Sequence, residues 1–357
     1  MAQFHKLTIE DIYKETDDCS VVTFAVPENL HSDFKFHQGQ HLTLRADIDG
    51  EDVRRSYSLC SSPFEKKWQV AIKQIPGGKF STYVNEQLTS GQVIDVMVPS
   101  GTFGVEVNKD ASKNYLFFAA GSGITPVMSM IKTHLKAEPN STCKLFYVNK
   151  TAKSIIFKEE LEQLRNTYFG RLEIYYFLTQ EKRDIDLFNG RFDDDKMAVL
   201  TKVFIDVPDT SEVFLCGPEK MVYYVSNYLI EAGLPKELVH YELFVTGLTE
   251  EDIKRQERLA KQNVEGVEVI IIDGGKEFLF TMTKDYDNIL DAALNAGADL
   301  PFACKGGVCS TCKCKVKDGD VEMKINYALE EDEVAQNLVL SCQAVPTTQK
   351  VVVDFDV

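Results

Sequence analysis

The sequence lacks the features of a membrane or secreted protein. Its 357 residues contain no apolar run near the 20 residues that a bilayer span requires. The opening stretch Met1-Ala2-Gln3-Phe4-His5-Lys6 has no apolar signal core. Internal repeats and low-complexity tracts are absent as well. We therefore expect a cytoplasmic protein with no membrane association, and its length predicts two or three domains.

Basic residues are scarce. There are 39 Lys and Arg against 55 Asp and Glu, a formal net charge of −16. Nucleic-acid binding needs a basic face, and so does an anionic membrane surface, so this balance argues against both. It suits docking on a basic patch of a partner, and equally well an acidity that serves only solubility.

The nine cysteines are distributed unevenly. Four of them fall between positions 304 and 314, and the other five are scattered. Disulfide scaffolds are short and secreted, and this chain is neither. Clustered cysteines in such a chain indicate metal or redox chemistry.

The first part of the chain, up to about residue 108, has short alternating runs separated by turns. Val21–Val26 and His41–Ala46 are examples, and Ser81–Leu88 is the best helical candidate. This pattern predicts an antiparallel barrel.

The pattern changes near Lys113. Tyr115–Ala120 is continuously apolar, as in a strand buried on both faces. Later strands are expected at 143–148, 172–178 and 212–216, with helices at 157–165 and 220–232 between and after them. Strands that alternate with helices predict a parallel α/β sheet.

A charged stretch, Thr249–Gln262, has no clear apolar stripe and is interpreted as an interdomain linker, partly helical. Alternation resumes at Val267, where two runs predict a hairpin, and 288–296 is expected to be helical. The cysteine cluster follows.

The cluster spacing is Cys304-x4-Cys309-x2-Cys312, and twenty-nine residues separate Cys312 from Cys342. Plant-type ferredoxins hold a [2Fe–2S] cluster with this arrangement, whereas zinc sites usually show paired C-x2–4-C knuckles. Gly306 and Gly307 allow the backbone to approach the cluster. Cys314 falls outside the ligand set and is expected to be an ordinary strand residue. Zinc is the alternative.

Two motifs point to a flavin. Arg55-Ser56-Tyr57-Ser58 ends a predicted strand, and Gly78-Lys79-Phe80-Ser81 precedes a predicted helix. They resemble the R-x-Y-S and G-x-x-S motifs of the ferredoxin–NADP reductase superfamily. The resemblance implies that the Arg binds flavin phosphate, the Tyr packs on the ring, the Ser contacts it near N5, and the turn amides hold the pyrophosphate. The alternative for the second motif is a simple turn with Ser81 as N-cap.

Two further motifs match the nucleotide half of that superfamily. They are Gly121-Ser122-Gly123-Ile124-Thr125-Pro126, after the buried strand, and Cys216-Gly217-Pro218, after another. The first differs from a Rossmann fingerprint because Pro126 replaces the third glycine. The resemblance places Cys216 near the hydride-transfer site. The alternatives are an ordinary glycine turn and an inert buried cysteine.

Coenzyme choice and the last strand are less defined. Lys150 could bind a 2′-phosphate, but Thr179-Gln180 replaces the Ser-Arg of plant-type NADP enzymes. Lys182 or Arg183 could compensate, and the alternative is that both are simply solvated. The family likeness implies NADPH, with NADH as the alternative. In related reductases the segment at 240–244 lies near the flavin, so Glu242 is a candidate for proton handling and Phe244 for a ring neighbour; an ordinary terminal strand is the alternative.

The motif order resembles that of reductases that feed bacterial multicomponent oxygenases. It implies a multidomain protein with a β-barrel FAD-binding domain (1–108), an α/β NAD(P)-binding domain (109–247), a linker (248–265) and an α+β (β-grasp) [2Fe–2S] ferredoxin domain (266–357). Ser58, Cys216 and Glu242 are the predicted catalytic residues. Residues 149–151, 155–161 and 187–191 resemble a branch of this family whose di-iron oxygenase partner acts on an aromatic acyl-CoA.

The implied activity is electron transfer from NAD(P)H through FAD and the cluster to that oxygenase. Residues 266–357 carry sixteen acidic and eight basic side chains, which would suit a basic docking site on the acceptor. Three other interpretations remain: a reductase of a ring-hydroxylating dioxygenase or O-demethylase, a free-standing flavin or ferric reductase, and a zinc-binding interaction scaffold.

Overall fold

The computed structural model describes residues 3–244, 250–262 and 266–357, with the backbone alone at 250, 251 and 260–262. The chain divides into two compact units, and each is considered by itself. The first contains residues 5–53 and 57–244, and the second consists mainly of the described residues from 250 onward. The expected linker bounds at 247–248 and 265 lie outside the described residues. No helix in the described part of the chain is long and apolar enough to cross a membrane.

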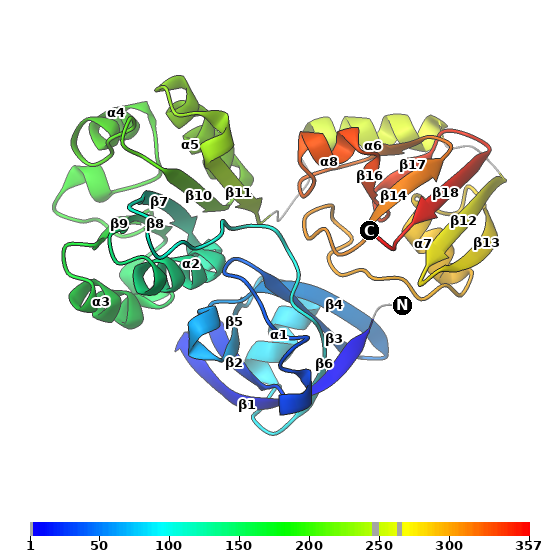
Figure 1. Cartoon of the computed structure of the whole chain (residues 1–357), viewed down its shortest axis with the longest axis horizontal. Coiled ribbons are helices and arrows are strands. Elements are labelled where there is room, and N and C mark those ends of the chain that lie inside the picture. The colour runs from blue at the N-terminus through cyan, green and yellow to red at the C-terminus, as the bar shows by residue number, and fades with distance from the viewer. Residues whose placement is uncertain (1–2, 245–249, 263–265) are drawn as a thin grey trace. The chain divides into compact units, whose positions relative to one another are not determined.

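The N-terminal part of the first unit is an antiparallel sheet with strand order β4-β3-β6-β1-β2-β5 (Figure 1). Its strands are β1 (Phe4–Thr16), β2 (Cys19–Ala25), β3 (His41–Ile48), β4 (Glu51–Ser58), β5 (Trp68–Lys73) and β6 (Val93–Met97). A bridge between Leu59 and Val70 joins the end of β4 to β5, so the sheet curls back on itself. The predicted antiparallel barrel is confirmed.

Short helices complete the barrel. They are η1 (Glu28–Leu30), η2 (Pro63–Glu65) and α1 (Lys79–Glu86). Phe80 and Val84 of α1 are buried in the barrel core together with alternating side chains of the strands. Inward-facing residues therefore form one apolar core, as the period of two in the sequence predicts.

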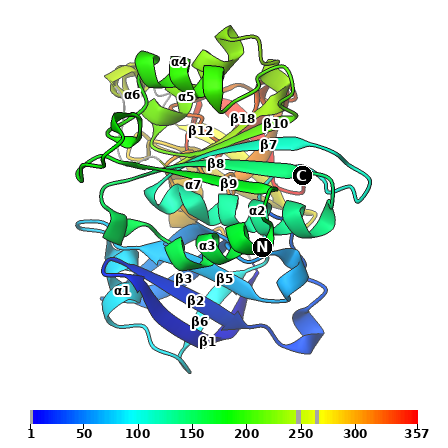
Figure 2. The same cartoon turned by 90° about the vertical axis from the view of Figure 1, so that its left-hand side faces the viewer.

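The second half of the first unit is a parallel sheet with strand order β11-β10-β7-β8-β9. Its strands are β7 (Asn114–Ala120), β8 (Thr142–Asn149), β9 (Leu172–Leu178), β10 (Glu212–Gly217) and β11 (Val239–Leu243). The helices are α2 (Ile124–Ala137), α3 (Lys158–Thr167), α4 (Asp194–Val203) and α5 (Glu219–Glu231), with short turns η3 (Gly121–Gly123), η4 (Ala152–Ser154), η5 (Asp186–Phe188) and η6 (Lys236–Leu238). Figure 2 shows α2 and α3 on the barrel side of the sheet and α4 and α5 on the other. The predicted α/β domain is confirmed.

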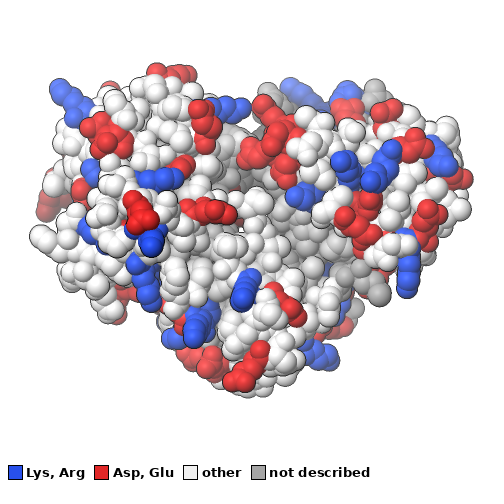
Figure 3. All heavy atoms as spheres, viewed as in Figure 1, with Lys and Arg blue, Asp and Glu red and all other residues white. Residues whose placement is uncertain are grey.

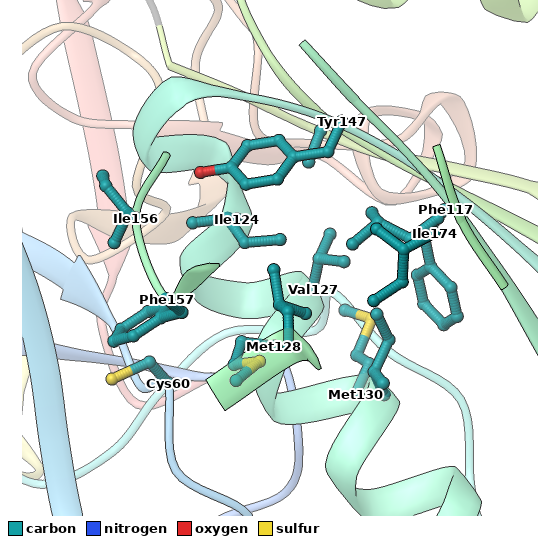
Figure 4. Packing of buried hydrophobic residues seen from close by; sticks show 14 of the residues in the cluster. Cys60, Phe117, Ile124, Val127, Met128, Met130, Tyr147, Ile156, Phe157 and Ile174 are labelled. Carbon is teal, nitrogen blue, oxygen red and sulfur yellow. The ribbon is translucent and has the colours of Figure 1, made fainter. Parts of the chain in front are cut away.

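Helix α2 is buried on two sides, between its sheet and the barrel (Figure 4). Twelve consecutive residues of it, from Ile124 to Leu135, are buried, including Lys132 and His134. Lys132 pairs with Glu160 of α3 at 2.5 Å and with Glu65 of η2 at 3.4 Å. The Ser129 hydroxyl donates to the carbonyl of Ser61 at 2.6 Å. These contacts fix the nucleotide domain on the barrel.

The second unit has a mixed sheet of order β13-β12-β18-β14-β16 and a small β15-β17 pair. Its strands are β12 (Val267–Asp273), β13 (Lys276–Met282), β14 (Lys313–Asp318), β15 (Val321–Met323), β16 (Leu338–Leu340), β17 (Ala344–Pro346) and β18 (Lys350–Asp354). Helices α7 (Ile289–Asn295) and α8 (Glu331–Ala335) accompany them. The predicted hairpin is β12–β13, and α7 begins after Asn288, whose side chain caps it.

The charged stretch expected to be a linker contains helix α6 (Glu250–Gln262). Leu259 of this helix is buried, and Arg258 pairs with Glu322 of β15. The Tyr327 hydroxyl donates to Asp252. Helix α6 therefore packs against the other elements of the second unit.

Acidic and basic side chains are interspersed on the face seen in Figure 3.

Candidate functional site

The four cysteines of the predicted cluster lie in two pairs. Cys304 and Cys309 are within hydrogen-bond distance of each other, and so are Cys312 and Cys342. Antiparallel pairing of β14 with β16 brings the residue before β14 next to the residues after β16. The Ser341 N–H and hydroxyl both donate to the Cys312 carbonyl, each at 3.0 Å. Two pairs of thiols suit a cluster of two irons held by four cysteines.

Main-chain N–H groups point at these sulfurs. The Gly306 N–H donates to Cys304 Sγ at 3.3 Å, and the Cys304 N–H donates to Cys309 Sγ at 3.5 Å. Such donors stabilise thiolate ligands, so the loop fits a cluster that carries negative charge. Cys309, Cys312 and Cys342 are buried, and Cys304 is partly exposed.

Cys314 lies in β14, opposite Val339 of β16, and its side chain is buried in the core of this unit. Burial raises the pKa of its thiol well above the ordinary value. No group of three or more His, Cys, Asp or Glu side chains in the described ranges is placed to hold a single metal ion.

The two flavin motifs meet in the barrel. Tyr57 near the end of β4 packs on Phe80 of α1, with ring centroids 5.8 Å apart. Ser58 is buried, and the exposed Arg55 donates to the Arg54 carbonyl at 2.7 Å. Ser56 is half-buried. Lys79 pairs with Glu51 of β4 at 2.5 Å. The fold thus brings together side chains from both motifs.

The turn before α1 differs from the alternative considered for its motif, a simple turn with Ser81 as N-cap. The helix begins at Lys79 with Gly78 as N-cap, so Ser81 lies in the first turn. Its hydroxyl donates to the Gly78 carbonyl at 3.1 Å and accepts from the Ile75 N–H at 3.2 Å. A Cβ on Gly78 would lie 2.5 Å from both Ser81 Oγ and Ile75 Cγ1. Glycine is required at position 78 because the Ser81 hydroxyl lies close beside it. This hydroxyl bonds to residues before the helix, so no side chain caps the first N–H groups of α1.

The two nucleotide motifs flank the point where the parallel sheet changes direction. The chain runs from β7 outward through β8 and β9, then returns to β10 on the other side of β7. The Gly121–Pro126 turn follows β7, and the Cys216–Pro218 turn follows β10. Open α/β sheets bind ligands at this crevice, outside the carboxyl ends of the strands.

The two turns touch. A Cβ on Gly123 would overlap the Cys216 carbonyl. Thr125 Oγ1 donates to the Ser122 carbonyl at 3.1 Å, which closes the turn. Pro126 is the third residue of α2, where a missing N–H removes no helical bond. Glycine at 123 is therefore a packing requirement as well as an opening for a ligand.

All three predicted catalytic residues lie together. The Ser58 hydroxyl donates to Glu242 Oε2 at 3.3 Å. Glu242 on β11 pairs directly with Cys216 on β10. Burial, and then the nearby Glu242 carboxylate, raise the pKa of the Cys216 thiol, which stays protonated at neutral pH. A hydroxyl, a carboxylate and a neutral thiol thus meet where the barrel joins the switch point.

One residue near the nucleotide turn was not predicted. The Tyr147 hydroxyl of β8 donates to the Gly121 carbonyl at 2.8 Å, and the side chain is fully buried. The signal was present in the sequence, because a tyrosine within an apolar parallel strand needs a partner for its hydroxyl. This hydrogen bond fixes the orientation of the turn at Gly121.

The three basic residues considered for coenzyme binding, Lys150, Lys182 and Arg183, have different surroundings. Lys150 is exposed, and its carbonyl accepts from the Gln180 N–H at 2.8 Å. The Arg183 guanidinium donates to the Tyr176 carbonyl at 2.7 Å and lies over the Phe188 ring. Lys182 is exposed. Arg183 therefore has a structural role in the loop after β9.

Phe244 follows β11 and is half-buried against the core of the nucleotide domain. Its N–H donates to the Gly217 carbonyl at 3.1 Å, and Pro218 caps α5. The end of the domain is thus tied to the Cys216–Pro218 turn.

Three family models match in the order of the predicted domains. An oxidoreductase FAD-binding domain matches residues 6–104, an oxidoreductase NAD-binding domain matches 117–227, and a 2Fe-2S iron-sulfur cluster binding domain matches 271–347. These matches confirm FAD, a pyridine nucleotide and a [2Fe–2S] cluster as the predicted cofactors.

Two curated proteins are similar over the full chain. One is a subunit of the 1,2-phenylacetyl-CoA epoxidase of Escherichia coli K12, which is 44% identical over 356 residues that cover 100% of this chain and 99% of that protein. The other is the ferredoxin reductase component of the 3-ketosteroid-9-alpha-monooxygenase of Rhodococcus rhodochrous. It is 31% identical over 98% of this chain and 96% of that protein.

Solved structures share the fold. Phthalate dioxygenase reductase superposes with a TM-score of 0.61 at 22% identity, over 99% of this chain and 98% of that one. An intact type IV self-sufficient cytochrome P450 monooxygenase gives a TM-score of 0.70 at 23% identity, over 98% of this chain and 41% of that one.

Proposed function

Because the chain belongs to the family of flavin and iron–sulfur reductase components of oxygenases, we propose that it supplies electrons to a phenylacetyl-CoA epoxidase. It is an oxidoreductase, and its partner is an oxygenase component. The likeness to a component of such an epoxidase, at 44% identity over the full length, supports the choice of partner. The observation that supports the reductase chemistry is the hydrogen bond from Ser58 to Glu242 at the switch point of the parallel sheet.

The flavin end is proposed as follows. Arg55 is exposed on β4 and binds the flavin phosphate as a two-pronged donor. Tyr57, held against Phe80, offers its other face to the flavin ring. The free amides at the start of α1, together with Lys79 and Ser81, hold the pyrophosphate.

The nucleotide end is proposed at the switch point. The amides of Gly121, Ser122 and Gly123 and the start of α2 receive the dinucleotide phosphates, with Thr125 and Pro126 shaping the turn. Gly217 and Pro218 border the crevice, and Phe244 lies beside the flavin. We propose NADPH as donor, with Lys150 near the 2′-phosphate and NADH as the alternative.

Ser58, Glu242 and Cys216 hold the reacting parts in place. When bound, FAD would supply the two-electron hydride chemistry and the cluster the one-electron chemistry, while this chain's residues orient them. The Ser58 hydroxyl orients toward the flavin, and the Glu242 carboxylate, which accepts its hydrogen bond, exchanges a proton with solvent. Cys216, a neutral thiol, packs beside the nicotinamide without adding charge.

The cluster is proposed on Cys304, Cys309, Cys312 and Cys342, with Cys304 nearest to solvent. The partner is proposed to be a di-iron oxygenase component, and the protein to be cytoplasmic. The proposed domain bounds are 1–108 for the FAD-binding domain, 109–247 for the NAD(P)-binding domain, 248–265 for the linker and 266–357 for the ferredoxin domain.

The test is reconstitution with purified oxygenase components. The full-length protein, loaded with FAD and cluster, is mixed with a phenylacetyl-CoA epoxidase oxygenase, phenylacetyl-CoA and NADPH. Epoxide formation that requires this protein supports the proposal. The same assay with a ring-hydroxylating dioxygenase or a 3-ketosteroid monooxygenase is the comparison. Turnover only with one of these would reject the epoxidase as partner while preserving the reductase.

A further inference from the structure

One buried side chain joins the two halves of the cysteine site. Gln343 directly follows Cys342 and is only 3% exposed. Its Nε2 donates to the Lys305 carbonyl at 2.9 Å and contacts Cys342 Sγ at 3.5 Å. A single amide group therefore contacts both the loop that carries Cys304 and the sulfur of the distant fourth cysteine.

The loop segment that Gln343 contacts has an unusual backbone. Lys305 has φ +52°, a left-handed conformation that non-glycine residues seldom adopt. At Gly307, with φ +75°, a Cβ would lie 3.3 Å from Gln343 Cγ. The amide thus bonds to one left-handed residue while its methylene packs on another. Such conformations persist where the surrounding structure holds them.

The orientation of the amide follows from its surroundings. Reversing it would place Oε1 against the Lys305 carbonyl, with two acceptors facing each other. In the orientation found, Oε1 is buried and has no hydrogen-bond partner among the described residues. An unpaired buried acceptor is unfavourable, so the contacts of Nε2 with carbonyl and sulfur determine how the side chain lies.

We propose that Gln343 is a positioning residue for the iron–sulfur cluster, fixing the loop at Lys305 and raising the reduction potential through its N–H contact with Cys342. This inference rests on the proposed function. Reduction adds negative charge to the cluster, and an N–H donor at a ligand sulfur stabilises that charge. Main-chain donors at Cys304 and Cys309 cannot be removed without moving the loop, whereas this side chain can be replaced.

The experiment uses full-length protein loaded with FAD and cluster. The variants are Gln343→Leu, which removes the donor, and Gln343→Glu, which keeps the length but replaces the donor by a carboxylate. Ser341→Ala is the matched control, because the Ser341 hydroxyl is equally buried and bonds to the Cys312 carbonyl, not to sulfur. The midpoint potential of the cluster is measured by EPR-monitored redox titration, with iron and flavin content.

We expect the equilibrium for cluster reduction in Gln343→Leu to fall about tenfold, a shift of ~59 mV to lower potential. Gln343→Glu is expected to shift further in the same direction, and Ser341→Ala by less than a third as much. If Gln343→Leu does not retain the cluster, its potential cannot be measured. The cluster content of Gln343→Glu and Ser341→Ala then tests the inference. Loss from both with retention in Ser341→Ala supports the positioning role, and loss from all three overturns it.

Clusters with the wild-type potential in the Gln343 variants overturn the inference and leave the reductase function standing. A wild-type protein that binds no iron and sulfide would reject the proposed function itself. The two failures are therefore distinguishable in one set of preparations.

Discussion

The Ser58 hydroxyl donates a hydrogen bond to the Glu242 carboxylate, although 184 positions separate the two residues in the chain. Ser58 ends a strand of the barrel, and Glu242 lies on an edge strand of the parallel sheet beside Cys216. Both cofactor-binding halves thus contribute to one small polar group. In the proposed function, this contact lies where the nucleotide and the flavin would meet.

Replacing Glu242 by Gln removes the charge at this contact and keeps the shape. If the carboxylate holds Ser58 and exchanges protons, flavin reduction by the nucleotide should slow roughly 10²-fold, with flavin content unchanged. Stopped-flow absorbance of the flavin measures this rate. Glu237→Gln, an exposed neighbour, is the control. An unchanged rate in Glu242→Gln would remove Glu242 from the mechanism.

The cysteine assignments predict opposite outcomes for two neighbouring positions. Cys342→Ser should abolish the iron–sulfur visible bands, because it removes one of four ligands. Cys314→Ser should retain them, since Cys314 packs in the core, although a buried hydroxyl costs about 1–3 kcal/mol of stability. Visible absorbance and iron content measure both. A cluster lost only from Cys314→Ser would reverse the assignment.

Coenzyme preference is tested at Lys150, an exposed cation after β8. If it contacts a 2′-phosphate, Lys150→Ala should raise KM for NADPH about tenfold and leave KM for NADH unchanged, because one ionic contact contributes about 1.4 kcal/mol. Steady-state reduction of ferricyanide with each nucleotide gives both values. Equal effects on the two nucleotides would place the 2′-phosphate elsewhere.

Lys132 is buried between the barrel and the nucleotide domain, where it pairs with Glu160 and Glu65. Replacing it by Met should destabilise the first unit by about 1–2 kcal/mol, because both carboxylates keep partial access to water once unpaired. Lys136→Met, exposed on the same helix, should change stability by less than about 0.5 kcal/mol. Urea unfolding followed by flavin release compares them. Equal stabilities would show that the buried ion pair does not hold the interface.

Glu138 is fully buried at the end of α2. Burial opposes its ionisation, but hydrogen bonds from His134, the Asn108 N–H, Ser141 and Tyr115 outweigh burial and lower the pKa from 4.5 to about 2. Because the folded-state pKa is depressed, the ionised group stabilises the fold above about pH 4.5. That stabilisation, roughly 3 kcal/mol, is lost as the pH falls from 4.5 toward 2.

Glu138→Gln should therefore be less stable than the parent at neutral pH, and the difference should shrink as the pH falls below 4.5. Urea unfolding at several pH values measures it, with exposed Glu159→Gln as the control. A stability difference that stays constant across this range would show that the carboxylate charge is not the cause.

Much of this molecule could be predicted from local patterns. The spacing of Cys304, Cys309 and Cys312 indicates a cluster loop because three ligands lie within nine residues. The buried run at 115–120 indicates a parallel strand because it is apolar on both faces. The alternative for Ser81, a simple N-cap, is not found because its hydroxyl accepts from the Ile75 N–H, a contact that depends on the whole turn.

Other features depend on tertiary structure. The order of strands places the turns after β7 and β10 side by side, and no local pattern shows that order. The contact of Ser58 with Glu242 and the amide contacts of Gln343 arise from packing between segments remote in sequence. A buried polar residue in an apolar context, as at Tyr147, is the available signal for such contacts.

The most direct test of the electron path is anaerobic rapid mixing of the loaded full-length protein with NADPH. Flavin bleaching followed by the EPR signal of the reduced cluster is the predicted result. In Cys342→Ser the flavin should bleach without that signal. Cluster reduction that precedes flavin reduction, or that occurs in protein stripped of FAD, would contradict the account.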